Sequence, residues 1–211
     1  MVLRASGNPG LQYIIGITII ALSIYAFYLL IASQNSPQLF LTPIPIDTGP
    51  EACEHVTLDG CSLCIPQGVS LETVESGWEF FSPQEKIRGK IEVFTGLPRE
   101  TSWRQSLRNP FIRAFIGDEA SMGSFELMEK ILKKKYNPTL MGAKAGLIPP
   151  WVKDAPEAAI FIPRDDQVII FSTEFQSLAL VFREPHIAMV TVDGRMERAS
   201  LAAMVTSITL P

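Results

Sequence analysis

The sequence predicts an α+β fold: a single transmembrane helix at the N-terminus, followed by an antiparallel sheet with two helices packed on it. Residues 13–32 form a run of twenty residues without a charged side chain. After residue 50, short β-branched and aromatic runs recur between Gly, Pro, Asp or Ser residues, a pattern typical of strands. Residues 124–136 and 196–208 instead repeat apolar side chains at helical spacing.

The uncharged N-terminal run is long enough for a membrane anchor, since twenty helical residues rise about 30 Å, the thickness of a bilayer's hydrocarbon core. A secretory signal peptide usually has a shorter apolar region and a small-x-small cleavage site, whereas here Ile31 precedes Ala32. We therefore expect an uncleaved single-pass signal-anchor. Arg4 is the one Lys or Arg before Lys86, so the positive-inside rule predicts that residues 1–12 are cytoplasmic. The C-terminal domain is then periplasmic, attached to a bacterial inner membrane.

Residues 33–50 contain four prolines, which predicts an extended and fairly stiff tether. This segment is more apolar than a free linker. Tyr25 and Tyr28 share one face of the preceding helix and could contact another membrane helix. We expect the apolar side chains of the tether to lie against the domain, the membrane surface or a partner, in particular Leu39, Phe40 and Leu41.

Residues 51–211 are enough for one domain with a substantial core. Breaks near residues 164–166, 174–177 and 184–185 predict turns, so the last third is expected to be an antiparallel meander. Strands followed by helices that cover one face of the sheet would give an α+β sandwich. The segments predicted as strands are residues 56–58, 62–65, 90–94, 111–116, 158–162, 167–172, 178–183 and 187–192.

Two segments resemble the Mog1/PsbP-like family. Gly60–Gly68 has the sequence GCSLCIPQG, similar to that family's opening strand, which ends in a Pro-x-Gly turn. The strand at residues 187–192, the turn Asp193-Gly194 and the terminal helix are similar to the family's close. Val69 stands where the family usually has Trp, and residues 75–156 carry no matching pattern. The resemblance implies an α+β module that binds partners or supports assembly without catalysing a reaction.

Cys53, His55, Cys61 and Cys64 form the pattern C-x-H-x5-C-x2-C, which supplies four groups of the type that bind zinc. A two-residue turn at Asp59-Gly60 would place His55 opposite Cys64 in a hairpin. Structural zinc sites usually draw two ligands from each of two separate knuckles, whereas here one hairpin would supply all four. The metal site is therefore the alternative to a disulfide.

A disulfide is the expectation for a domain outside the cytoplasm. Positions 61 and 64 point to opposite faces of a strand, so we expect Cys53 to bond to Cys61 or Cys64 and to leave one thiol over. A reactive C-x-x-C pair needs a helix start, which Pro66 disfavours, and haem attachment needs His after Cys64. We expect no cofactor.

Other function classes find little support. The net charge of −4 does not suggest a nucleic-acid surface. The chain has only His55 and His186, and it has no nucleophile motif, P-loop or GxGxxG, so we expect no enzyme. Trp151, after two prolines, either packs into the core or forms an exposed docking ledge for a partner.

The sequence thus predicts a non-catalytic, membrane-anchored extracytoplasmic subunit that binds or stabilises a larger membrane protein complex. No small-molecule substrate is indicated. The alternative is a thiol- or metal-binding envelope protein that uses Cys53, His55, Cys61 and Cys64.

Overall fold

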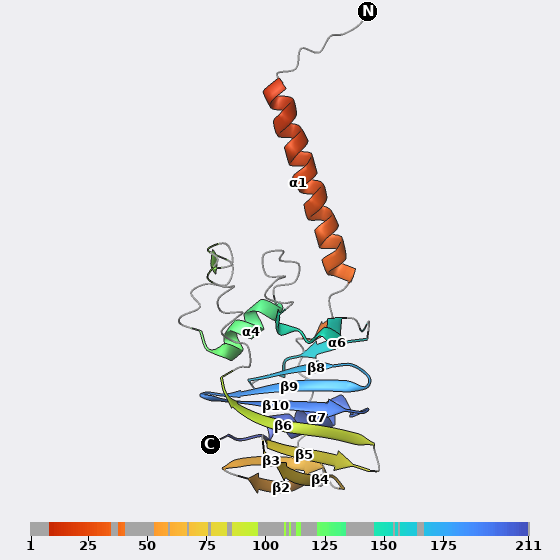
Figure 1. The fold of residues 1–211 in the computed structure, drawn as a ribbon, viewed down its shortest axis with the longest axis vertical. Helices are drawn as coiled ribbons and strands as arrows, with labels where there is room; N and C mark the ends of the chain where they lie inside the picture. Colours follow the sequence, from red (N-terminus) through yellow and green to blue (C-terminus); the bar gives the residue numbers. More distant parts are fainter. Residues whose placement is uncertain are drawn as a thin grey trace, which may run out of the picture. The chain divides into compact units, whose positions relative to one another are not determined.

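The structure is a computed structural model of the chain, in which the backbone divides into two compact units, residues 1–36 and 37–211 (Figure 1). We describe each unit by itself. The described residues are 9–34, 38–40, 53–58, 60–66, 68–75, 77–83, 86–96, 108, 110, 113–114, 122–133, 146–153, 155, 157–163 and 167–210.

Helix α1 (Pro9–Gln34) is the described part of the first unit. It contains no acidic residue in its first turn and no basic residue in its last turn. Large apolar side chains project from every side of it, and each exposes between 48% and 76% of its surface: Tyr13, Ile14, Ile15, Ile17, Ile19, Ile20, Leu22, Ile24, Tyr25 and Phe27.

The predicted transmembrane helix at residues 13–32 is corrected by the structure. The side chains described on α1 are those of residue 10 and residues 12–28, and within the described part of the chain no helix is both long and apolar enough to cross a membrane. Residues 12–28 rise about 25 Å at 1.5 Å per residue, which is less than the roughly 30 Å of a hydrocarbon core. The single-pass, signal-anchor prediction is therefore wrong for the described residues.

The second unit is built on an eight-stranded sheet (Figure 1). Neighbouring strands are antiparallel except at one edge, where β1 runs parallel to β7. A separate antiparallel hairpin consists of β2 (Cys53–Leu58) and β3 (Cys61–Pro66). The strands of the large sheet, in spatial order, are β1 (Gln38–Phe40), β7 (Ala159–Phe161), β8 (Val168–Ser172), β9 (Gln176–Arg183), β10 (His186–Asp193), β6 (Ile87–Thr95), β5 (Gly77–Ser82) and β4 (Ser70–Val74).

All but one of the predicted strand segments coincide with strands of the structure. The exception is residues 111–116, where Arg113 and Ala114 are helical, so a strand across this segment is wrong. A short apolar run does not by itself distinguish a strand from a buried helix, which explains the error. The sequence interpretation missed β1, β4, β5 and the short helix α6 (Pro150–Lys153).

The central strands are buried on both faces, and all five residues of β8 are buried. One face contacts helix α7 (Arg198–Thr206) and the apolar residues of β3. The other face contacts helix α4 (Ser124–Lys133) together with Val152 of α6. Strands that are apolar on both sides need cover on both sides.

The predicted fold class is therefore corrected. The sequence interpretation placed two helices on one face of an antiparallel sheet, whereas α4 and α7 belong to the cores on opposite faces. The second unit is mostly sheet with small helices, and its β1–β7 edge is parallel. The predicted packing of the terminal segment 196–208 on the sheet is confirmed, since its apolar residues Leu201, Met204, Val205 and Ile208 all lie in one core cluster.

The β2–β3 hairpin is joined to the end of α7 by hydrogen bonds. The Ser62 amide donates to the Thr209 carbonyl at 3.1 Å, and the Thr209 amide donates back to the Ser62 carbonyl at 2.9 Å. The Cys64 amide donates to Ser207 Oγ at 2.8 Å. Because β3 is apolar on the side that faces the core, the hairpin acts as part of the cover over the sheet.

Replacement of Phe182 by alanine tests the core beneath α4. The Phe182 ring is fully buried and meets the Phe125 ring of α4 edge to face, with the ring centroids 5.5 Å apart. We expect Phe182→Ala to lower the free energy of unfolding by about 3 to 5 kcal/mol, measured by urea denaturation. The control is Phe175→Ala, because Phe175 is 63% exposed and should change stability by less than about 0.5 kcal/mol. A loss below about 1 kcal/mol for Phe182→Ala would contradict this packing.

Candidate functional site

The Cys-His region forms the hairpin that the sequence predicts. His55 pairs with Cys64 in the antiparallel register of β2 and β3, as expected from the turn at Asp59-Gly60, and Gly60 has a positive φ of 82°. Cys61 lies in the hydrophobic core with Leu63, on the side of β3 that faces the sheet. Strand alternation directs Cys64 to the other side.

This arrangement does not bring together a metal site among the described side chains. No group of three or more His, Cys, Asp or Glu side chains in that part of the chain could hold a metal ion. The side chain of Cys53 lies outside the described residues. The alternative function that uses Cys53, His55, Cys61 and Cys64 therefore gains no support from the described geometry, because the strand alternation separates Cys61 from the other face.

Of the two bridges that the sequence predicts for Cys53, the structure excludes the one to Cys61. No bridge joins two cysteines whose side chains are described, because Cys61 is buried and reduced. Cys64 is itself in the disulfide form, but a bond to Cys53 would involve a side chain outside the described residues. The option of a Cys61 bridge is thus excluded, and Cys61 instead serves as a small apolar core residue.

The residues predicted to contact partners lie in different places. Leu39 and Phe40 belong to β1 and pair with Ile160 and Phe161 of β7, so this part of the tether is ordered against the domain. Only the backbone of Leu39 and Phe40 is described, and Leu41 lies outside the described residues. Trp151 is partly buried and packs against the core beneath α4, which favours core packing over a docking ledge. On α1, Tyr25 is 48% exposed and Tyr28 is partly exposed.

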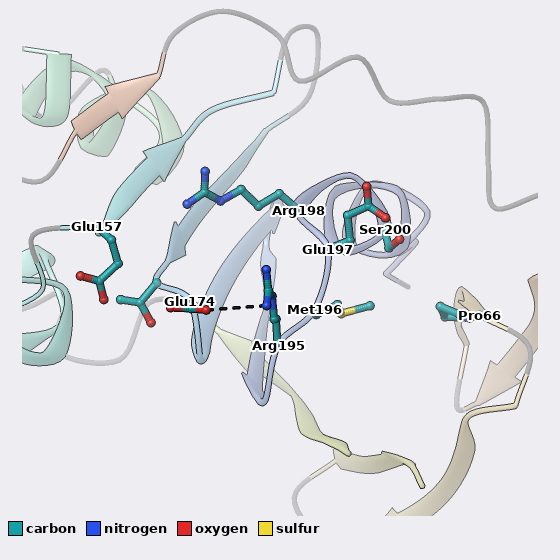
Figure 2. Close-up of a pocket in the computed structure, with 9 residues that line it drawn as sticks. Pro66, Glu157, Glu174, Arg195, Met196, Glu197, Arg198 and Ser200 are labelled. Carbon is teal, nitrogen blue, oxygen red and sulfur yellow. Dashed lines mark ion pairs between the residues drawn. The ribbon is translucent and has the colours of Figure 1, made fainter. Parts of the chain in front are cut away.

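A groove of about 840 Å³ lies where the β8–β9 turn, the β10–α7 connection and the start of α7 meet. Figure 2 shows Glu157 at one end of this groove and Pro66 of β3 at the other, with Arg195 and Met196 between them. We call it the α7 groove. Its lining residues are Pro66, Glu157, Thr173, Glu174, Arg195, Met196, Glu197, Arg198 and Ser200.

The α7 groove carries charges of both signs. Arg195 and Glu174 form an ion pair with 3.7 Å between Nη1 and Oε1, and their side chains are 80% and 51% exposed (Figure 2). The Arg198 guanidinium lies 4.8 Å from the centroid of the Phe161 ring, a cation–π contact. Exposed ion pairs contribute little to stability, so Arg195 and Glu174 remain available for polar contacts with a ligand.

The described lining of the groove contains carboxylate, guanidinium and hydroxyl groups. No histidine or cysteine lines it. The Thr173 hydroxyl is engaged in its own turn, since Oγ1 donates to the Gln176 carbonyl and accepts from the Gln176 amide.

The sequence interpretation did not find the α7 groove. Its residues come from β3, from the segment before β7, from the β8–β9 turn and from the start of α7, and only the sheet topology brings these segments together. The chain matches no protein-family model, and no curated protein matches it in sequence. The resemblance to the Mog1/PsbP-like family stays a prediction.

Substitution of the two groove arginines separates their roles. We expect Arg198→Ala to lower the free energy of unfolding by about 0.5 to 1 kcal/mol, because it removes the cation–π contact with Phe161. Arg195→Ala is the matched control, since it removes only an exposed ion pair and should cost less than about 0.5 kcal/mol. Urea denaturation of both variants measures the difference, and equal losses would contradict the assigned contacts.

Proposed function

We propose that this chain is a non-catalytic accessory subunit that binds or stabilises a larger protein complex, and that α1 is the element its partner subunits enclose. The observation that carries the proposal is the exposure of large apolar side chains around α1. Ile17, Ile20 and Ile24, for example, expose 64%, 61% and 65% of their surfaces. The predicted periplasmic location depended on a transmembrane anchor and stays a prediction.

The exposed side chains of α1 are energetically important for such an association. Burial of one large aliphatic or aromatic side chain stabilises a complex by about 1.5 to 3 kcal/mol before the costs of association. Exposed apolar area of this extent usually marks an interaction surface.

The distribution of the side chains around α1 indicates the type of partner. Successive helical residues are separated by about 100°, so Ile14, Ile15 and Ile17 point in three different directions. A helix that is apolar on all sides needs neighbours on all sides. A single shallow groove would leave much of α1 exposed, so the partner is expected to surround it with several apolar elements.

Site-specific photo-cross-linking in the cells that make the protein tests this proposal. A photo-reactive benzoyl-phenylalanine in place of Phe27 should form an adduct of one defined mass with a partner subunit. The same group in place of Phe175 should not, although the two positions are 66% and 63% exposed. Adducts with lipid alone, with a second copy of the chain alone, or with nothing would contradict the proposal.

A matched pair of charge substitutions provides the second test. Phe27→Glu places a carboxylate inside the proposed enclosure, so the amount of chain found in the complex should fall at least about tenfold. Phe175→Glu makes the same chemical change at similar exposure in the second unit and should leave the yield unchanged. Native mass spectrometry of the purified complex measures both. If the two variants are found in the complex in equal amounts, α1 is not part of the interface.

A further inference from the structure

Strand β4 ends the large sheet, and its residues suggest what can bind there. Residues 70–74 pair with residues 77–81 of β5 on one side. On the other side, β4 pairs with no strand among those that the structure describes. Alternate residues of such an edge point their backbone N–H and C=O groups outward, where another strand can accept and donate hydrogen bonds.

Two cross-strand rows of side chains reach this edge on the face of the sheet opposite Trp78 and Phe80. One row is formed by Lys90, Glu79 and Glu72 in register across β6, β5 and β4. Beside it runs a second row, in which Arg88 and Phe81 lead to Ser70 at the edge. Each row ends at β4, so a strand added to this edge would contribute the next side chain of each row.

The carboxylates of the first row favour a cationic side chain at the position next to Glu72 on an added strand. Glu72 faces Glu79 directly across the strand pair, and like charges in this position are unfavourable. Glu79 already has a cationic neighbour, because Arg88 Nη2 lies 3.0 Å from its Oε2. Glu72 is exposed at the edge, about 4.5 to 5.5 Å from where the next side chain in the row would lie.

The second row offers an apolar contact. Phe81 is 48% exposed, and the small side chain of Ser70 beside it leaves the ring open toward the edge. A hollow of about 340 Å³ lies at this place. Its lining residues are Ser70, Glu72, Glu79, Phe80, Phe81 and Arg88.

We propose that β4 is a strand-addition site, at which a partner protein contributes an extended segment with Lys or Arg opposite Glu72 and an apolar side chain two residues away, against Phe81. Backbone hydrogen bonds to β4 supply affinity, and the two rows supply specificity and register. This site lies in the second unit and uses no residue of α1, so it can fail or succeed independently of the proposed function.

The charges argue against a second copy of this chain as the occupant. If two β4 strands paired antiparallel over all five residues, Glu72 would face its own copy, with Glu79 on either side. Four carboxylates would then lie in one row, which is unfavourable. Glu72 therefore opposes self-association at this edge and favours a cationic strand.

A binding measurement with the full chain tests the proposal. The probe is a labelled seven-residue peptide of β-branched residues, with Lys at its centre and Phe two positions further along. We expect Glu72→Lys to weaken binding of this peptide at least about tenfold, because an attractive pair becomes a repulsive one. A second peptide, with Glu in place of Lys, should bind the Glu72→Lys variant better than it binds the unaltered chain. Glu54→Lys on the exposed strand β2 is the matched control and should change neither affinity.

Hydrogen exchange identifies the position of the peptide. Bound peptide should slow exchange of the β4 amides, an effect that a surface ion pair alone would not produce. Equal binding to the unaltered chain and to Glu72→Lys, or protection elsewhere without protection of β4, would overturn the proposal. Formation of a dimer of the chain in which the β4 amides are protected without peptide would also overturn it in favour of self-pairing.

Discussion

The fold of the second unit depends on one constraint: the strands at the centre of its sheet are apolar on both faces. Ile169 and Ile170 are neighbours on β8 and point to opposite sides, yet both are buried. Apolar surface that stays in water is costly, so both faces require cover. Helix α7 and the β2–β3 hairpin supply it on one face, and α4 with α6 on the other. The hydrogen bonds from Ser62 and Cys64 to the end of α7 connect the two parts of the first cover.

The same constraint explains where binding surfaces arise. The apolar core beneath α4 includes residues of β7 to β10, whereas the corresponding face of β4 to β6 carries charged residues such as Glu79 and Arg88. Within the described part of the chain, the sheet therefore ends at β4 in a charged edge that no further strand pairs with. The α7 groove lies at another margin of the cover, where the start of α7 leaves Arg195 and Arg198 at the surface. Both sites are rich in charge because they are not part of either core.

Local sequence patterns predicted the individual strands and helices better than they predicted how these pack together. The turn predicted at Asp59-Gly60 led to the correct pairing of His55 with Cys64, because a two-residue turn leaves little choice of register. Strands β4 and β5 were not predicted because Glu72 and Glu79 interrupt the apolar pattern of their sequences. The helices were assigned to one face, although consecutive apolar residues in β8 already indicate that both faces are buried. The α7 groove could not be predicted, since its residues meet only through the order of strands in the sheet.

Native-state hydrogen exchange of the full chain tests most directly whether the doubly covered strands control the fold. Amides of β8, β9 and β10, such as Val181 and Val190, should exchange only through global unfolding, with the same free energy as that obtained from denaturant. Amides of β4 should exchange through local opening at a distinctly lower free energy, because the strand lies at the sheet edge and contributes few buried side chains. Exchange of the β9 amides at a free energy as low as that of β4 would contradict the account.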